Sequence, residues 1–553
     1  MQNGLSEAGR SLFGRARFRE RIDPLGFAEA LGQVGMRTAF SALPKKLAGL
    51  GLESAKIALG RSSVAPEPKD WRFKNRAWQE NLFFHRLGQS YLAWTRAASD
   101  LVDDAHLDWR TEERARLATA IITSSLAPTN VGLLNPDAIE RAFETGGRSV
   151  VTGLRNFSRD LITDRGLPRS ADPSAFTVGR DLAVTPGAVV FRNEVCELLQ
   201  YTPSTDFVST TPLVMVPPQV NKYYFMDLAP GRSFVEYCVQ QGFQMYTVSW
   251  RNPTEDHSNW GVDTYVDALI EAMHAVCEIT GIAQVNTVSL CAGGITTAAL
   301  LGHLASTQDD LVNCATFAVT LLDFSVPTMI GMFATPQIIG HAVRSSKRAG
   351  VVKGNDAKAL FALLRPNDLI WNYWVNSNLI GDEQPTFDVL AWNADSTRLP
   401  AALHADFLDM MLHNSLAAGN FVVHGSPIDL SKVECDAFVV GARTDHLTAW
   451  RACYATTQLL GGTCQFALSS SGHIQSLVNP PGNPKSSVVT AIASEADPEE
   501  WLAKSEPVTG SWWEPWSDWL RARSGERRPA PTTLGSAQHP AGEAAPGNYV
   551  LAP

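Results

Sequence analysis

The sequence predicts an α/β protein in which a largely parallel sheet is covered by helices on both faces. From about residue 186, short apolar segments alternate with segments of helical periodicity. The strand-like segments are almost continuously apolar, as in parallel sheets that are buried on both sides. At 553 residues, 45% of them hydrophobic and 18% charged, the chain is long enough for two or three globular domains.

The first 185 residues are predicted to form a mainly helical N-terminal domain. Apolar residues recur at near-helical spacing over residues 82–94 and 117–126, and Ala127-Pro-Thr-Asn130 reads as a break. This region carries no catalytic constellation. It is interpreted either as a helical shell on the core or as an element for docking or dimerisation.

The catalytic domain is predicted over residues 186–525. Helices are expected at 233–241 and 262–280, and strands at 187–191, 197–201, 212–218, 244–250, 285–290, 314–322, 435–442 and 464–469. The alternation stops at about 325–420, which we interpret as a cap insertion over the active site, the alternative being a helical excursion on the flank of the sheet. Residues 526–553 are rich in Pro, Ala and Gly and predict a flexible tail.

A candidate nucleophile lies in Ser289-Leu290-Cys291-Ala292-Gly293-Gly294. The segment before it is β-type, and the segment after it begins with small residues and then reads as a helix. Strand, nucleophile, tight turn and helix make up the nucleophile elbow of the α/β-hydrolase fold. The glycines suit a helix that passes close to the strand, and the positive helix N-terminus favours a thiolate. The alternative is a buried core cysteine, because free cysteine is among the most buried residue types.

A thiol nucleophile needs a histidine base and an acid, which follow the nucleophile in that fold in the order acid, then histidine. Asp445 lies in the loop after the strand at 435–442, and His473 follows the strand at 464–469. Both residues match in order and in placement at strand ends. His446 is the competing histidine, and it could instead shape the pocket.

The oxyanion hole is expected to use the backbone N–H of Ala292, the residue after the nucleophile, and a second N–H from the loop after an early strand. That loop is Val216-Pro-Pro-Gln-Val-Asn221, in which the two prolines have no N–H. Val220 or Asn221 is therefore the candidate donor. A thiolate suits acyl transfer from a thioester, because exchange between thiol and thioester is nearly balanced and keeps the acyl group activated.

Composition argues against several other classes of function. The formal net charge of -10 disfavours a mainly electrostatic nucleic-acid binder. The eight cysteines are scattered without a CxxC pair, which predicts a reduced, cytoplasmic protein without a metal site. No GxGxxG or Walker sequence is present, so no nucleotide cofactor is expected. The apolar stretch 314–340 contains Asp323, Pro327 and Pro336, so no transmembrane segment is expected.

At these residues the chain resembles the poly(3-hydroxyalkanoate) polymerases, the PHA synthases, over almost its whole length. The likeness rests on the segments Pro217–Tyr224, Val248–Pro253, Leu364–Tyr373 and Ser471–Ile474, and a closer likeness to the class II, medium-chain-length enzymes rests on Trp392–Ala401, Asn479–Pro484 and Gly542–Tyr549. The resemblance implies polymerisation of (R)-3-hydroxyacyl-CoA into an intracellular polyester with release of CoA. It maps the family's nucleophile to Cys291, its Asp-His pair to Asp445 and His446, and its Gly-His motif to His473.

The resemblance also implies partners and a location. They are the acyl-CoA and the growing polyester, a second copy of the chain in a homodimer, and the polymer granule surface with its associated proteins in the cytoplasm. CoA would be part of the substrate and a product, so no cofactor is expected. Aromatic residues outside the core suggest that the N-terminal region and the Trp-rich end help dimerisation or granule docking.

Two positions depart from the family pattern. Ser289 stands where the Gly-x-Cys-x-Gly-Gly box begins with Gly, and Ala449 replaces the usual Pro near Asp445. We expect Ser289 to be tolerated with some change in activity, and Ala449 to loosen the loop that carries Asp445. Neither change removes a catalytic atom. The alternative activity is hydrolysis, as an acyl-CoA thioesterase or polyester depolymerase on the same fold, although such enzymes usually place Ser in the elbow.

Overall fold

The computed structural model describes residues 23–163, 166–172, 175–383 and 386–552. The chain divides into two compact units. Unit 1 comprises residues 1–172 and 356–386, and unit 2 comprises residues 173–355 and 387–553. The part of the predicted N-terminal domain before residue 23 lies outside the described residues.

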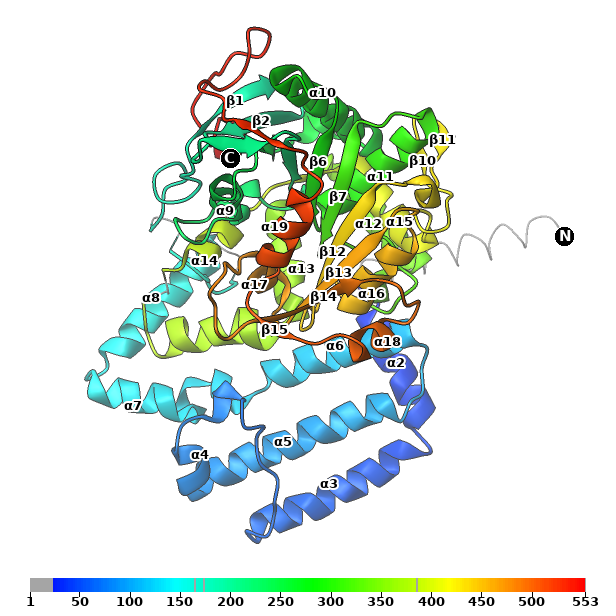
Figure 1. Ribbon diagram of the computed structural model, residues 1–553. Coiled ribbons are helices and arrows are strands. Elements are labelled where there is room, and N and C mark those ends of the chain that lie inside the picture. The colour runs from blue at the N-terminus through cyan, green and yellow to red at the C-terminus, as the bar shows by residue number, and fades with distance from the viewer. Residues whose placement is uncertain (1–22, 164–165, 173–174, 384–385, 553) are drawn as a thin grey trace, which may run out of the picture. The chain divides into compact units, whose positions relative to one another are not determined.

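Unit 2 is built on a sheet of ten strands among its described residues, in the order β1-β2-β5-β4-β6-β7-β12-β13-β14-β15 (Figure 1). The six central strands from β5 to β13 run parallel, and antiparallel strands flank them on both edges. The bounds are β1 Gly187–Arg192, β2 Cys196–Tyr201, β4 Leu213–Val216, β5 Met245–Trp250, β6 Val285–Leu290, β7 Val312–Ala318, β12 Asp436–Ala442, β13 Cys464–Ser469, β14 Ser487–Ile492 and β15 Val508–Thr509.

The sheet separates two hydrophobic cores. Successive residues of β4 point to opposite faces, so Val214 and Val216 enter one core while Leu213 and Met215 enter the other. The first core is closed by α10 Val262–Thr280, α11 Ala292–Thr307, α15 Ala401–His413, α16 Trp450–Ala455 and α18 Pro498–Ala503, and the second by α9 Phe234–Gln240, α17 His473–Leu477 and α19 Trp513–Arg521. This arrangement confirms the predicted α/β class.

The remaining elements of unit 2 are short, apart from one helix. They are the helices α12 Pro336–Ala349 and α14 Asp388–Ala394, the strands β3 Phe207–Ser209, β8 Val351–Val352, β9 Leu399–Pro400, β10 Val422–Val423, β11 Ser426–Pro427 and β16 Arg527–Pro529, and the 3₁₀ turns η4 Tyr223–Met226, η5 Glu255–His257, η6 Gly331–Phe333, η9 Leu430–Lys432, η10 Thr456–Gln458 and η11 Tyr549–Leu551.

Residues 526–552 pack against the rest of unit 2, which corrects the prediction of a flexible tail over 526–553 for its described part. β16 pairs with β3. The fully buried carboxylate of Glu197 on β2 accepts hydrogen bonds from the backbone N–H groups of Asn548 and Tyr549, both at 2.9 Å. A buried carboxylate requires such partners, and the tail supplies them. Composition alone could not reveal this because the partner lies about 350 residues earlier.

The Trp-rich segment is also part of the core. Trp512, Trp513 and Trp516 are at most 1% exposed and pack against Phe234 of α9. The aromatic rings that suggested docking or dimerisation through this end are therefore core residues, and they give that hypothesis no exposed surface.

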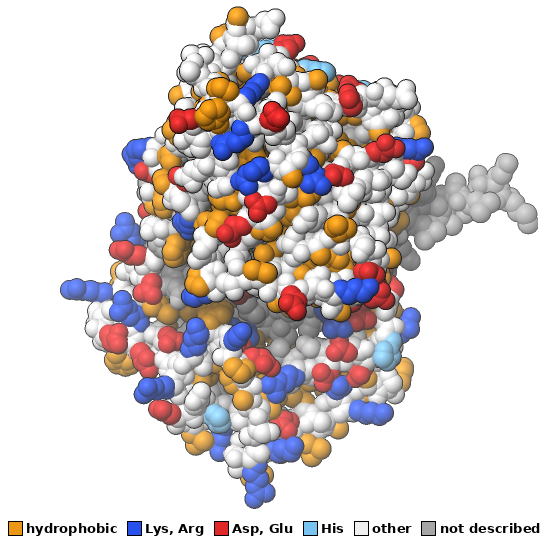
Figure 2. Space-filling view, in the orientation of Figure 1, with side chains coloured by type: hydrophobic (Ala, Val, Ile, Leu, Met, Phe, Trp, Pro, Cys, Tyr) orange, Lys and Arg blue, Asp and Glu red, His pale blue; other side chains and the backbone are white. Residues whose placement is uncertain are grey.

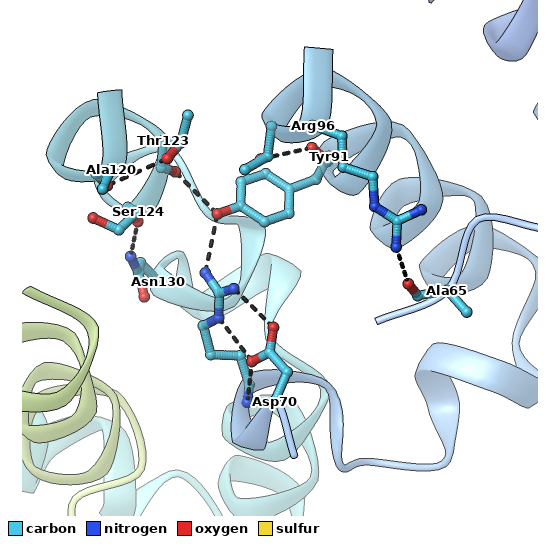
Figure 3. A network of polar contacts seen from close by, with 10 residues as sticks. Ala65, Asp70, Tyr91, Arg96, Ala120, Thr123, Ser124 and Asn130 are labelled. Atoms are coloured by element: carbon cyan, nitrogen blue, oxygen red, sulfur yellow. Dashed lines mark hydrogen bonds and ion pairs between the residues drawn. The ribbon is translucent and has the colours of Figure 1, made fainter. Parts of the chain in front are cut away.

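Unit 1 is helical among its described residues. Its elements are α2 Phe27–Thr38, α3 Ala42–Ala58, η1 Trp71–Phe73, α4 Ala77–Glu80, α5 Leu82–Asp103, α6 Trp109–Ser125, η2 Pro128–Asn130, η3 Gly132–Leu134, α7 Pro136–Glu144, α8 Arg148–Thr163, α13 Gly354–Leu364, and the π-helical segments η7 Asn367–Trp371 and η8 Trp374–Leu379. Arg72 joins three of them. It donates to Asp70 from Nε and Nη2 and to the Tyr91 hydroxyl from Nη1, and Tyr91 in turn donates to the Thr123 carbonyl (Figure 3).

The segment 356–386, which the sequence placed within the cap, groups with the helices of unit 1. Trp374 Nε1 donates to the Asn130 carbonyl at 3.0 Å, and Asn156 Nδ2 donates to the Ser377 carbonyl at 3.0 Å. A Cβ on Gly153 of α8 would lie 2.2 Å from the Asn378 carbonyl oxygen, so a glycine is needed for this close approach.

Candidate active site

Cys291 lies between β6 and α11 with φ 49° and ψ -120°. A positive φ is costly for a residue with a side chain, and such strain clusters at functional sites. The turn is possible because Gly293 and Gly294 follow. A Cβ on Gly293 would lie 2.5 Å from the carbonyl oxygens of Val216 and Pro217. The strand, strained thiol residue and helix together form a nucleophile elbow.

Ser289 is accommodated without loss of packing. Its side chain is fully buried on β6, and its hydroxyl donates to the Thr316 carbonyl on β7 at 2.7 Å. A buried hydroxyl needs such a partner. Ala449 has φ -50° at the start of α16, which lies within the range that a proline would impose.

Asp445 and His473 are brought together from the ends of β12 and β13. His473 Nδ1 is 2.6 Å from Asp445 Oδ2. The carboxylate also accepts bonds from the Thr448 hydroxyl at 2.6 Å and from the backbone N–H groups of Leu447 and Thr448. Cys291 contributes to the raised pKa of His473, so the thiol and the imidazole interact electrostatically. Of the three residues proposed from the sequence, Asp445 and His473 are thus in direct contact, and Cys291 interacts electrostatically with His473.

Electrostatics favour a charged Asp445–His473 pair. Burial lowers the pKa of His473, but the Asp445 charge, the hydrogen bond with Asp445 and the interaction with Cys291 outweigh it and raise that pKa to about 10. Burial raises the pKa of the Asp445 carboxyl, but the charge of His473 and the bonds from His473 and Thr448 lower it overall. The pair is therefore an imidazolium and a carboxylate at neutral pH.

Thr448 is a site residue that the sequence analysis missed. It contributes both a hydroxyl and a backbone N–H to Asp445. An Asp followed three residues later by a Thr after a strand is the available signal, because Asp side chains commonly accept bonds from backbone N–H groups two and three residues further on. His446 is half-buried on the same loop, and its assignment to the pocket stays a prediction.

The two proposed oxyanion donors have no acceptor among the described residues. Ala292 is the first residue of α11, where helix N–H groups lack intrahelical partners. On the loop after β4, the Asn221 N–H donates to Thr397 Oγ1 at 2.9 Å, whereas the Val220 N–H has no described acceptor. Of the two alternatives that the sequence left open, the geometry therefore favours Val220.

The C-terminal residues contact the loop after β4 and the lysine that follows it. Lys222 is paired with Asp395 at 2.8 Å, and its ammonium donates to the Ala552 carbonyl at 3.3 Å. Val550 lines a cavity of about 10 Å³ together with Gln219 and Lys222. That volume holds about one water molecule.

Comparison with known proteins places the chain in a family. A model of the N-terminus of poly-beta-hydroxybutyrate polymerases matches residues 69–238, and a model of the alpha/beta hydrolase fold matches residues 212–480. The chain is 45% identical over 507 residues to poly(3-hydroxyalkanoate) polymerase 1 of Ectopseudomonas oleovorans, covering 92% of this chain and 90% of that one. The chain belongs to the poly(3-hydroxyalkanoate) polymerase family. The predicted α/β-hydrolase fold is confirmed by the second match.

Other polymerases of the family match over similar lengths. Polymerase 2 of the same bacterium is 46% identical, with 91% of this chain and 90% of that one covered. The polymerase subunit PhaC of Cupriavidus necator is 38% identical, with coverages of 90% and 85%. The chain is thus an enzyme of the poly(3-hydroxyalkanoate) polymerase family, as the sequence motifs indicated.

Other features of this polymerase family member concern cysteines, metals and membranes. All eight cysteines are unpaired. Across the described parts of the chain, no three His, Cys, Asp or Glu side chains gather so that they could hold a metal ion. In those same parts, no helix has the combination of length and apolar character that crossing a bilayer requires.

Proposed function

We propose that this chain polymerises (R)-3-hydroxyacyl-CoA into polyhydroxyalkanoate with release of CoA, by covalent catalysis at Cys291. The observation that carries the proposal is a thiol at a strained elbow together with an Asp-paired histidine, in a member of the polymerase family. A thioester on Cys291 stays reactive towards a hydroxyl, which serves chain growth. CoA is part of the substrate, and the proposal requires no cofactor.

In the proposed acylation, Cys291 reacts as a thiolate whose proton is already held by the His473 imidazolium, and the sulfur attacks the thioester carbonyl. The resulting oxyanion is stabilised by the N–H groups of Ala292 and Val220. The carbon–sulfur bond to CoA then breaks, and the CoA sulfur takes the proton from His473. The His473 imidazolium that these reaction steps need is stabilised by Asp445, which explains the raised pKa of His473.

In the proposed elongation step, the 3-hydroxyl of an incoming 3-hydroxyacyl-CoA attacks the Cys291 thioester while His473, neutral after its proton has passed to CoA, accepts the hydroxyl proton. The carbon–sulfur bond to Cys291 then breaks, which leaves Cys291 as a thiolate and the lengthened chain on CoA, ready to acylate Cys291 again. Asp445 orients His473 in this scheme and does not contact the hydroxyl. Its side chain is fully buried and accepts four hydrogen bonds, so direct contact with substrate would require one of them to break. This burial supports an orienting role for Asp445 over direct assistance to the 3-hydroxyl.

Incubation of the purified chain with (R)-3-hydroxyoctanoyl-CoA tests the activity. We expect CoA release, measured with a thiol reagent, together with polyester detected after methanolysis. Release of CoA with only free hydroxy acid would support hydrolysis instead, as by a thioesterase or depolymerase.

We further propose that the chain works as a homodimer in the cytoplasm, at the surface of polymer granules and beside granule-associated proteins. The outer face of α8 supports a docking role for unit 1. Val151, Leu154, Leu161 and Ile162 are 58–83% exposed and fall on one helical stripe. Exposed apolar patches usually mark interaction surfaces. On the face shown in Figure 2, hydrophobic side chains are interspersed with charged ones.

Serine at these four positions of α8 is expected to lower the granule-bound fraction of the enzyme, because the stripe would lose its apolar surface. The fraction is measured by sedimenting granules from a polymer-producing host. Serine at the exposed positions Val422, Ile492 and Val508 of unit 2 is the matched control and should leave binding unchanged. Equal binding of both variants would contradict docking through α8.

A further inference from the structure

The hydroxyl of Thr397 holds the loop after β4 at two backbone groups. Thr397 Oγ1 accepts a hydrogen bond from the Asn221 N–H at 2.9 Å and donates one to the Gln219 carbonyl at 3.1 Å. The two bonds lie on either side of Val220. Thr397 belongs to the segment Trp392–Ala401, to which no catalytic role has been given so far.

These bonds fix the direction of the Val220 N–H. The Gln219 carbonyl and the Val220 N–H belong to one peptide plane, and in a trans peptide they point in opposite directions. Because the carbonyl points towards Thr397, the Val220 N–H points away from it. No described residue accepts a bond from this N–H, and Val220 is half-buried, so the N–H is left open to an acceptor on a substrate.

The same loop is tied to the nucleophile elbow. Gly293 lies against the carbonyls of Val216 and Pro217, and Gln219 Nε2 donates to Thr296 Oγ1 on α11 at 2.9 Å. The loop therefore has a fixed position relative to the first turn of the helix that follows Cys291. A donor whose direction is set within this loop is set relative to the nucleophile as well.

We infer that Thr397 is a positioning residue that aims the Val220 N–H at the oxyanion formed during acyl transfer. The inference rests on the proposed function, since it takes Val220 as the second oxyanion donor. Neighbouring contacts hold the segment independently of the hydroxyl. Trp392 Nε1 donates to the Lys222 carbonyl at 2.7 Å, and Asp395 pairs with the Lys222 ammonium. Loss of the hydroxyl alone should thus free the peptide plane while the segment stays in place.

Thr397→Val, which is nearly isosteric, tests the inference. An oxyanion exists only near the transition state, so we expect kcat for CoA release to fall by about ten- to a hundredfold while KM changes by less than about twofold. Thr397→Ser restores the hydroxyl and should stay within about threefold of the unaltered chain. Thr457→Val is the control, because Thr457 is a buried threonine whose hydroxyl donates to the Tyr454 carbonyl away from the site.

Alkylation of Cys291 by iodoacetamide separates positioning from general structural damage. This reaction forms a sulfur–carbon bond and expels iodide without passing through an oxyanion. Its rate, followed by mass spectrometry of the Cys291 peptide, should be the same in Thr397→Val as in the unaltered chain. A parallel fall in alkylation and acyl transfer would overturn the inference, as would a kcat within about twofold of normal.

A p-nitrophenyl ester distinguishes failure of this inference from failure of the proposed function. If the unaltered chain cleaves the ester but makes no polymer from the acyl-CoA, the polymerase proposal fails. Ester cleavage by Thr397→Val would still show whether Thr397 matters, because ester cleavage also forms an oxyanion. A normal rate of ester cleavage in that variant counts against Thr397, and a slowed rate with normal alkylation supports it.

Discussion

Cys291→Ala is expected to abolish CoA release from (R)-3-hydroxyacyl-CoA, by about 10⁴-fold or more, as removal of a covalent nucleophile does elsewhere. The sulfur is the only atom at the elbow that can carry the acyl chain. The variant should fold, because the alanine removes a single half-buried atom and keeps the turn between Gly293 and β6. Thermal unfolding followed by circular dichroism checks this, and intact-protein mass spectrometry checks the loss of the acyl adduct.

Cys277→Ala provides the matched control for that experiment. Cys277 is likewise half-buried and unpaired, but it lies on α10, and burial raises the pKa of its thiol to about 11. Its replacement should leave CoA release unchanged. Full activity of Cys291→Ala, or an acyl adduct on another cysteine, would show that the assigned nucleophile is wrong.

Asp445→Asn is expected to lower CoA release by about 10²- to 10⁴-fold, because an amide neither stabilises the imidazolium nor holds the required tautomer of His473. The same change should lower the pKa of His473, since burial then opposes the charge without the carboxylate to offset it. At pH 8 the His473 ring should be protonated in the unaltered chain and neutral in the variant. Nitrogen NMR of histidine-labelled protein, assigned with His473→Gln, measures both states.

The pH dependence of the folding stability follows from the direction in which folding shifts the pKa of His473 and of Asp445. Folding raises the pKa of His473 from 6.5 to about 10, so its contribution is complete below pH 6.5 and falls as the pH rises towards 10. Folding lowers the pKa of Asp445 below 3.8, so its contribution to folding stability is present above that pH and is lost as the pH falls through the folded value.

Thr448→Val removes one of the four hydrogen bonds to Asp445 and should lower CoA release by less than Asp445→Asn does. An unchanged His473 titration in Asp445→Asn would contradict the electrostatic account.

The elbow and its partners were predictable because their signals are local and ordered along the chain. A β-type run, a thiol and two glycines place Cys291, and strand-end loops place Asp445 and His473. The parallel sheet followed from apolar strands that alternate with helices. These patterns depend on neighbouring residues, and so one sequence contains them in full.

Other features depended on contacts between distant segments. The buried Glu197 carboxylate gives no sign in the sequence that it will hold the backbone near Tyr549. Composition likewise cannot show that Trp516 lies against Phe234 rather than at the surface. The role inferred for Thr397 depends on a backbone approach across about 175 residues, and a single threonine in a polar segment has no pattern that predicts it.

The contact between Lys222 and Ala552 has a consequence for how the enzyme becomes active during its synthesis. On the ribosome, Cys291, Asp445 and His473 are all translated before residues 543–552, which fasten the tail at Glu197 and reach the loop after β4. A nascent chain that already contains every catalytic side chain therefore still lacks the contact between Lys222 and Ala552 at the end of the loop after β4. We therefore expect the loop after β4 to gain this contact only once Ala552 has been translated.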